Sequence, residues 1–497
     1  MNEHRNEHRN EHGDERVEGQ GDERGDEHVN RARQQARGER APSRRRRRGR
    51  GMRTGMAATA AVLLAALTAA PAVAVGASAT APAVQGAIPA GHGPTVTSHS
   101  ATPIVQGATP AVHSATVTSR GAARADHGRG TLVSVVPLGH VSRARIVEQA
   151  REAGFDGEAA RHDVADYRLT YRTVTPEGRP TTASGLLVLP EGGARRLPTV
   201  VHAHGTLSYR GYAPSVADDS PDRAATQLFA SLGRVGVAPD YLGLGTGPGR
   251  HLYMDAWSSS AASLDVLRAA RSAVRALGRS MDGRVGVTGF SQGGQVAMAL
   301  SRELAGGVDP RFRLRALAPV SGPYDLEGST LPGMFDGRVA PDAAVYYVSY
   351  YLTAQNRRYP LYKDPHDVFR APYADRVETL FDGEHPAEDV EGKLPGSLKE
   401  LLTDTWHEKL RHPSGLFRKV IRASGGTCDW APEPDVPTTL YTATGDTHVP
   451  VANTRACVRS LAKYGARATV IDQGAKTGHF GTWQRSVPDI ARSLPAG

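Results

Sequence analysis

Residues 284–294 read Arg-Val-Gly-Val-Thr-Gly-Phe-Ser-Gln-Gly-Gly, with the serine at position 291. The apolar run before the serine is typical of a buried strand, and the small residues 295–304 are typical of a helix. A strand that turns sharply into a helix strains the backbone at the turn, and glycines two positions before and after Ser291 let the two elements pass closely. Such a turn exposes the serine hydroxyl at the carboxyl edge of a sheet. The alternative is an ordinary turn rich in glycine and serine, so the interpretation depends on partners elsewhere in the chain.

The first 51 residues form a charged, low-complexity segment. They repeat Asn-Glu-His-Arg and then Gly-Asp-Glu-Arg, which favours a solvated charged stretch over a metal site. We expect that translation starts naturally at Met52 and that residues 1–51 are not native. The whole chain has a formal net charge of +9, but its clustered basic run, residues 44–50, lies directly before an apolar segment. The charge therefore predicts export rather than nucleic-acid binding.

The following segment has the parts of a secretory signal peptide. An apolar run over residues 56–70 follows the basic residues, and small residues with Ala-x-Ala-like cleavage sites occupy 72–79. We expect a signal peptide over 52–79, a secreted protein and no stable membrane span after cleavage. An anchor in the cell envelope is the alternative, although the run is short for a span of about 20 residues. Residues 80–130 are rich in Ala, Pro and Thr and predict a disordered linker or propeptide.

Residues 131–497 alternate strand patterns with helical patterns and predict one catalytic domain. The helical patterns cover 222–232 and 256–277. Alternation of this kind predicts an α/β fold with a mainly parallel, eight-stranded sheet flanked by helices, and it places functional loops at the carboxyl ends of the strands. The eight predicted strands cover residues 167–173, 182–189, 197–203, 235–239, 285–288, 314–320, 438–442 and 468–472.

The alternation stops after the sixth predicted strand. About residues 322–430 contain an aromatic run at 346–351 and a helical pattern near 398–410. An insertion at this place would lie over the functional edge of the sheet, so we expect a cap or lid. Exposed aromatic side chains of the cap would suit an apolar substrate wall. The alternative is a surface subdomain that takes no part in catalysis.

A serine nucleophile needs a base to take its proton and a carboxylate to orient that base. Asp446 follows the seventh predicted strand, and His479 follows the eighth. Both residues therefore fall in loops at the carboxyl edge where Ser291 is expected, in the order nucleophile, acid and base. The sequence predicts a catalytic triad of Ser291, Asp446 and His479.

Other acids and histidines fall near the same edge. Asp240 better suits the turn after the fourth predicted strand, and Asp472 lies within the eighth. His448 lies only two residues after Asp446, which makes it a poor base in this topology. Three further histidines are interpreted as structural or substrate-lining residues: His202, His204 and His251.

The oxyanion of a tetrahedral intermediate needs backbone N–H donors. One donor is expected at Gln292, directly after the nucleophile. The second is expected at Thr206, with Gly205 as the alternative, in the loop His-Ala-His-Gly-Thr that follows the third predicted strand.

The sequence contains two cysteines, Cys428 and Cys457. In an exported protein such a pair predicts a disulfide, with two free buried thiols as the alternative. The surroundings of these residues do not make a metal site.

Five motifs fall in order along residues 165–495: the His-Gly-Thr loop, Pro-Asp-Tyr-Leu-Gly-Leu-Gly at 239–245, the segment around Ser291, Gly-Asp-Thr-His-Val-Pro at 445–450, and Gly-His at 478–479. Together they resemble the α/β-hydrolase superfamily, and the chain is similar to the secretory lipase (lipase A-like) family. The resemblance implies a serine esterase or lipase that acts on small-molecule or lipid esters. No metal or organic cofactor and no particular oligomeric state are implied. A secreted serine peptidase of the same fold and a catalytically inactive binding protein are the alternatives.

Overall fold

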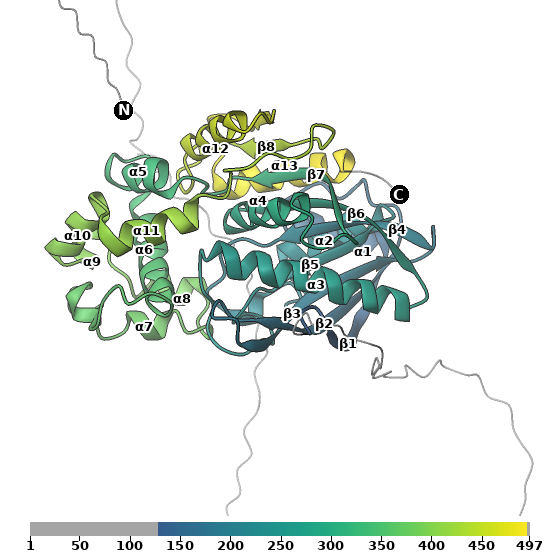
Figure 1. The fold of residues 1–497 in the computed structure, drawn as a ribbon, viewed down its shortest axis with the longest axis horizontal. Helices are drawn as coiled ribbons and strands as arrows, with labels where there is room; N and C mark the ends of the chain where they lie inside the picture. The colour runs from purple at the N-terminus through teal and green to yellow at the C-terminus, as the bar shows by residue number, and fades with distance from the viewer. Residues whose placement is uncertain (1–127, 495–497) are drawn as a thin grey trace, which may run out of the picture. The chain divides into compact units, whose positions relative to one another are not determined.

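A nine-stranded sheet runs through residues 128–494, the part of the chain that the computed structural model describes (Figure 1). The predicted N-terminal extension and signal peptide, and nearly all of the predicted linker, lie outside these residues. The strand order is β1-β2-β3-β5-β4-β6-β7-β8-β9. The first three pairs are antiparallel, and the five pairs from β5 to β9 are parallel. The strands are β1 (Leu132–Val141), β2 (Val164–Val174), β3 (Pro180–Pro190), β4 (Arg196–Ala203), β5 (Val235–Pro239), β6 (Ser280–Phe290), β7 (Arg313–Val320), β8 (Thr439–Thr442) and β9 (Thr469–Asp472).

The mainly parallel α/β sheet is confirmed, but the predicted number of eight strands is wrong. The additional strand is β1, which pairs with β2 at the edge of the sheet. It contains Pro137 and Gly139, which weaken a strand pattern, and its register with β2 shifts between these two residues. Its exposure also fails to alternate, because an edge strand with irregular pairing does not present one clean buried face. Periodicity therefore could not detect it.

Helices cover both faces of the sheet, and each layer has its own apolar core. On one face, side chains of α3 (Ala256–Ala276), α4 (Gln292–Ala305) and α12 (Ala452–Lys463) share a core with the inner strands. On the other face, α1 (Arg143–Glu152), α2 (Pro221–Ser231) and α13 (His479–Ser493) do the same. Strands buried on both faces read as continuous apolar runs, which is why the inner strands could be predicted from sequence.

The interval between β7 and β8 is helical and builds a third apolar core. We call its helical part, residues 326–425, the cap; its helices lie together beside the sheet in Figure 1. The cap contains the π-helix η2 (Leu326–Thr330) and the 3₁₀-helix η3 (Pro365–Asp367). Its α-helices are α5 (Leu331–Phe335), α6 (Pro341–Asn356), α7 (Val377–Leu380), α8 (Ala387–Glu391), α9 (Leu398–Leu401), α10 (Asp404–Arg411) and α11 (Gly415–Gly425).

Two expectations about the cap are wrong in detail. The predicted helix near 398–410 is split into α9 and α10, because the side chain of Thr403 caps α10 by accepting a hydrogen bond from the backbone of Trp406. The aromatic run lies on α6, and three of its four tyrosines are buried instead of exposed: Tyr346, Tyr350 and Tyr351. Tyr346 packs edge-on against the ring of Phe381 and Tyr350 stacks on it, and all three tyrosines belong to the cap's own apolar core.

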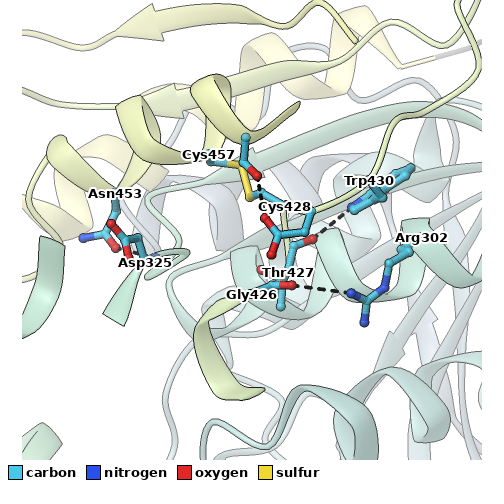
Figure 2. Close-up of a disulfide and its surroundings, with 10 residues drawn as sticks. Arg302, Asp325, Gly426, Thr427, Cys428, Trp430, Asn453 and Cys457 are labelled. Carbon is cyan, nitrogen blue, oxygen red and sulfur yellow. Dashed lines mark hydrogen bonds between the residues drawn. A yellow bond between two sulfur atoms is a disulfide. The ribbon is translucent and has the colours of Figure 1, made fainter. Parts of the chain in front are cut away.

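Helix α12 holds both ends of the cap (Figure 2). At the entry, the side-chain oxygen of Asn453 accepts hydrogen bonds from the backbone of Asp325 and the hydroxyl of Thr330, both at 3.0 Å. At the exit, Cys457 forms a disulfide with Cys428, so the two cysteines are paired as the sequence predicts. Asn453 and Cys457 lie one helical turn apart on the same face of α12.

None of the helices within residues 128–494 combines the length and apolar character that a bilayer span requires.

We expect the disulfide to contribute about 3 to 4 kcal/mol to the free energy of unfolding, because it closes a loop with a sequence separation of 29 in the unfolded chain. The double variant C428A/C457A should therefore unfold at a lower guanidinium concentration than the wild type. Reductant should lower the wild-type midpoint and leave that of the double variant unchanged. Equal midpoints for the oxidised wild type and the double variant would contradict this expectation.

Candidate active site

Ser291 lies at the tight turn between β6 and α4 and has a strained backbone, with φ of 56° and ψ of −119°. The close passage of strand and helix demands glycine on both sides of it. A Cβ atom on Gly289 would lie 2.2 Å from the carbonyl oxygen of Gly293, and one on Gly293 would lie 1.9 Å from that of Ala203. Both separations are impossible for real side chains, so the glycine spacing around the serine is a steric requirement of this turn.

The structure brings the three predicted triad residues together. The Nε2 atom of His479 lies 2.9 Å from Oγ of Ser291, and its Nδ1 atom lies 2.8 Å from Oδ2 of Asp446. The three side chains come from the loops after β6, β8 and β9, and each residue is buried. This arrangement can transfer a proton from the serine to the imidazole while the carboxylate holds the ring.

Asp446 is held in its ionised form. Burial by itself would raise the pKa of Asp446, but the charge of His479 and hydrogen bonds from His479, Val449 and His448 outweigh it, so the pKa is lowered. The other carboxylate oxygen, Oδ1, accepts the backbone N–H groups of His448 and Val449, each at 2.9 Å. The loop therefore fixes the orientation of the carboxylate as well as its charge.

Aromatic rings surround the imidazole of His479. The ring of Phe290, the residue before Ser291, lies 4.6 Å from it, and the ring of Phe480 lies 5.7 Å from it. The ring of His448 stacks on the imidazole at 5.1 Å, with an angle of 13° between the planes. Its Nδ1 atom shares a hydrogen bond of 2.9 Å with the hydroxyl of Tyr347 from the cap. His448 therefore packs against His479, and its Nδ1 atom is engaged in a hydrogen bond with Tyr347 of the cap.

The predicted oxyanion donors lie around the same serine. Gln292 is the first residue of α4, and Gly205 and Thr206 line a cavity together with Ser291. Within residues 128–494, no protein acceptor takes a hydrogen bond from the backbone N–H of Gln292, Thr206 or Gly205. The hydroxyl of Thr206 donates to that of Tyr253 at 3.2 Å, which holds the loop against the segment before α3.

His251 forms a hydrogen bond with the side chain of Gln292. The side-chain amide of Gln292 donates to Nε2 of His251 at 2.8 Å, and Nδ1–H of His251 donates to the carbonyl of Leu242 at 2.9 Å. This pattern requires a neutral imidazole. Burial, with a smaller contribution from the nearby positive charge of Arg357, lowers the pKa of His251 to about 3. His251 is therefore structural, which is one of the two roles expected for it, and it holds the side chain of the residue that follows Ser291.

The remaining candidates have structural partners. Buried Asp240 accepts hydrogen bonds from the hydroxyls of Ser184 and Ser215, so it stabilises the turn after β5. Asp472 ends β9 and accepts the backbone N–H of Thr444. His202 pairs with Asp222, and His204 contacts the carbonyl oxygens of Gly205 and Asp240. Among the described residues, no group of three or more His, Cys, Asp or Glu could hold a metal ion.

A cavity of about 430 Å³ opens in front of Ser291, between the sheet edge and the cap. One cap residue that was not predicted to be a site residue, Tyr347, lines this cavity and contacts His448. The aromatic run at 346–351 indicated tyrosines near the site. Which of them faces the cavity depends on how α6 packs, and this cannot be read from the run itself.

A nine-stranded α/β sheet with this serine turn and a helical cap defines an α/β-hydrolase. The comparisons with known proteins agree. A ligand-bound form of the rice cell wall degrading esterase LipA from Xanthomonas oryzae has 30% sequence identity and a TM-score of 0.64, over 73% of this chain and 97% of that chain. The chain therefore belongs to the lipase/esterase-like family of α/β-hydrolases, which supports ester hydrolysis at the level of the family.

More distant structures share the fold. A protein from Legionella pneumophila subsp. pneumophila str. Philadelphia 1 has 23% identity and a TM-score of 0.67, over 73% of this chain and 96% of that chain. Candida antarctica lipase A has 15% identity and a TM-score of 0.51, over 71% of this chain and 78% of that chain. No family model matches the sequence, and neither does any curated protein.

The neutral state of His251 predicts a pH dependence of stability. Above about pH 6.5 the residue is neutral in both the folded and unfolded states. As the pH falls from 6.5 towards 3, the unfolded chain binds a proton that the folded chain excludes, so stability decreases by up to about 1.4 kcal/mol per pH unit. The variant H251Q has no imidazole at this position to bind the proton. The difference in free energy of unfolding between the wild type and H251Q should therefore shrink as the pH falls from 6 to 4. Urea unfolding of both proteins at each pH gives the free energy of unfolding as a function of pH. An equal dependence on pH in the two proteins would rule out a neutral buried His251.

Proposed function

We propose that this chain is a secreted serine hydrolase that cleaves carboxylic esters through an acyl-enzyme on Ser291. The observation that carries the proposal is the hydrogen-bonded series Asp446, His479 and Ser291, which ends on a serine at the wall of a cavity. The LipA relative is an esterase, which supports the choice of ester substrates. The substrate class is a small-molecule or lipid ester.

In the acylation step, Oγ of Ser291 attacks the ester carbonyl while Nε2 of His479 accepts its proton. A bond forms between Oγ and the carbonyl carbon, and the tetrahedral oxyanion is stabilised by the backbone N–H of Gln292 and that of Thr206. When the intermediate collapses, the bond to the alcohol oxygen breaks and His479 donates its proton to that oxygen. Asp446 stabilises the imidazolium between these two events, and its lowered pKa keeps it charged for this role.

Water completes the reaction. His479 takes a proton from the water, whose oxygen attacks the acyl carbon, and the bond to Oγ of Ser291 then breaks as the proton returns to Oγ. The products are a carboxylic acid and the regenerated serine. Every proton that leaves the nucleophile passes through Nε2 of His479, which explains why that atom faces Ser291 and Nδ1 faces Asp446.

Two features support secretion. The residues 52–79 have the composition of a signal peptide, as described above. The disulfide between Cys428 and Cys457 suits an oxidising compartment outside the cytosol. The N-terminal sequence of the mature protein, made from the native gene, would establish whether cleavage occurs near residues 74–79.

We expect S291A to lower the rate of p-nitrophenyl ester hydrolysis by a factor of about 10⁴ to 10⁶, because the acyl-enzyme cannot form. S301A is the matched control: Ser301 is also buried on α4 but does not line the cavity at Ser291, so this variant should keep its activity. A fluorophosphonate probe should label the wild type and S301A but not S291A.

Two outcomes would contradict the proposal. Wild-type turnover retained in S291A would exclude Ser291 as the nucleophile. Faster cleavage of aminoacyl amides than of acyl esters by the wild type would indicate a peptidase with the same triad.

A further inference from the structure

A second, smaller cavity meets the first at the nucleophile. It has a volume of about 60 Å³, compared with about 430 Å³ for the larger cavity. Three residues line both cavities: Ser291, Tyr347 and His448. The site is therefore divided, with the serine at the junction of two spaces.

The partition between the two cavities is a hydrogen-bonded pair. Tyr347 comes from helix α6 of the cap and His448 from the loop that carries Asp446, and their side chains meet at 2.9 Å. His448 is also stacked on His479, so the partition is fixed from the sheet side as well as from the cap side. A wall held from two sides can keep two parts of one substrate apart.

The position of His479 decides which part of an ester enters which cavity. His479 lines the larger cavity and is absent from the lining of the smaller one. The leaving alcohol oxygen must lie within hydrogen-bond distance of Nε2 of His479 to receive its proton. Thr206, the proposed oxyanion donor, also lines only the larger cavity. The alcohol and the oxyanion therefore point into the larger cavity, and the remaining substituent of the tetrahedral carbon, the acyl chain, points into the smaller one.

The smaller cavity is shaped for a short hydrocarbon chain. Its lining is mainly apolar and comes largely from the cap, for example Met334, Leu410 and Ile421. A volume of about 60 Å³ holds on the order of two to five groups the size of a water molecule, and a methylene is of similar size.

We propose that this cavity, bounded by the pair Tyr347 and His448, is the acyl site and that it takes short aliphatic acyl groups of up to about six carbons. The inference rests on the proposed function and adds to it the division of the substrate. Esters with a short acyl group and a bulky alcohol are then the preferred class.

The test compares p-nitrophenyl acetate, butyrate, octanoate and laurate, which share one leaving group. The value of kcat/KM should be at least about tenfold lower for octanoate than for butyrate, since a poorly fitting hydrocarbon loses about tenfold or more. M334A enlarges the smaller cavity and should raise the octanoate-to-butyrate ratio at least about fivefold. The matched control is L394A, which removes the same kind of side chain from the larger cavity and should leave this ratio within about twofold of the wild type.

A second, milder variant keeps the test valid if M334A does not fold. I421V removes one methyl group from the smaller cavity and should raise the same ratio by about twofold, with thermal unfolding used to establish that each variant is folded. Equal rates for butyrate and laurate, or a ratio that responds to L394A and not to M334A and I421V, would overturn the assignment of the acyl site while leaving the esterase proposal intact. Absence of turnover with every ester, together with no fluorophosphonate labelling of Ser291, would overturn both.

Discussion

The site depends on one steric constraint, the turn at Ser291. The positive φ of this residue is unfavourable by about 1 to 3 kcal/mol, and only well-packed surroundings maintain it. Here β6 lies between β4 and β7 inside the sheet, and α4 is packed so closely on the strand that side chains on Gly289 and Gly293 would collide with backbone. The turn puts Gln292 directly after Ser291, as the first residue of α4. His251 then binds the Gln292 side chain, so the start of this helix is held in place.

Asp446 and His479 reach Ser291 because parallel strands end at a common edge. β8 and β9 follow β7 in the sheet; Asp446 lies in the loop after β8, and His479 begins helix α13 after β9. The cap completes the site from above: Tyr347 contacts His448, whose backbone N–H binds Asp446 and whose ring stacks on His479. His448 thus contacts the cap, Asp446 and His479 together.

The inner strands, and the grouping of Ser291 with Asp446 and His479, could be predicted because each follows from a local rule. Buried parallel strands give apolar runs, and the loops after them gather at one edge whatever the rest of the chain does. The edge strand β1 was missed because Pro137 and Gly139 interrupt its pattern and its exposure does not alternate. The cap followed no such rule. Most of its helices are short. On the longest one, α6, Tyr350 stacks on Phe381, 31 positions away, so burial there is decided by long-range packing that no local pattern records.

The disulfide between Cys428 and Cys457 encloses the segment that carries the acid. Strand β8 and Asp446 lie inside this covalent ring, and α12, at its far end, also holds the entry of the cap through Asn453. A protease that cuts the backbone at any point between the two cysteines therefore leaves both fragments joined. The consequence is tolerance of proteolysis: a nicked chain keeps the segment that carries Asp446 tethered to helix α12.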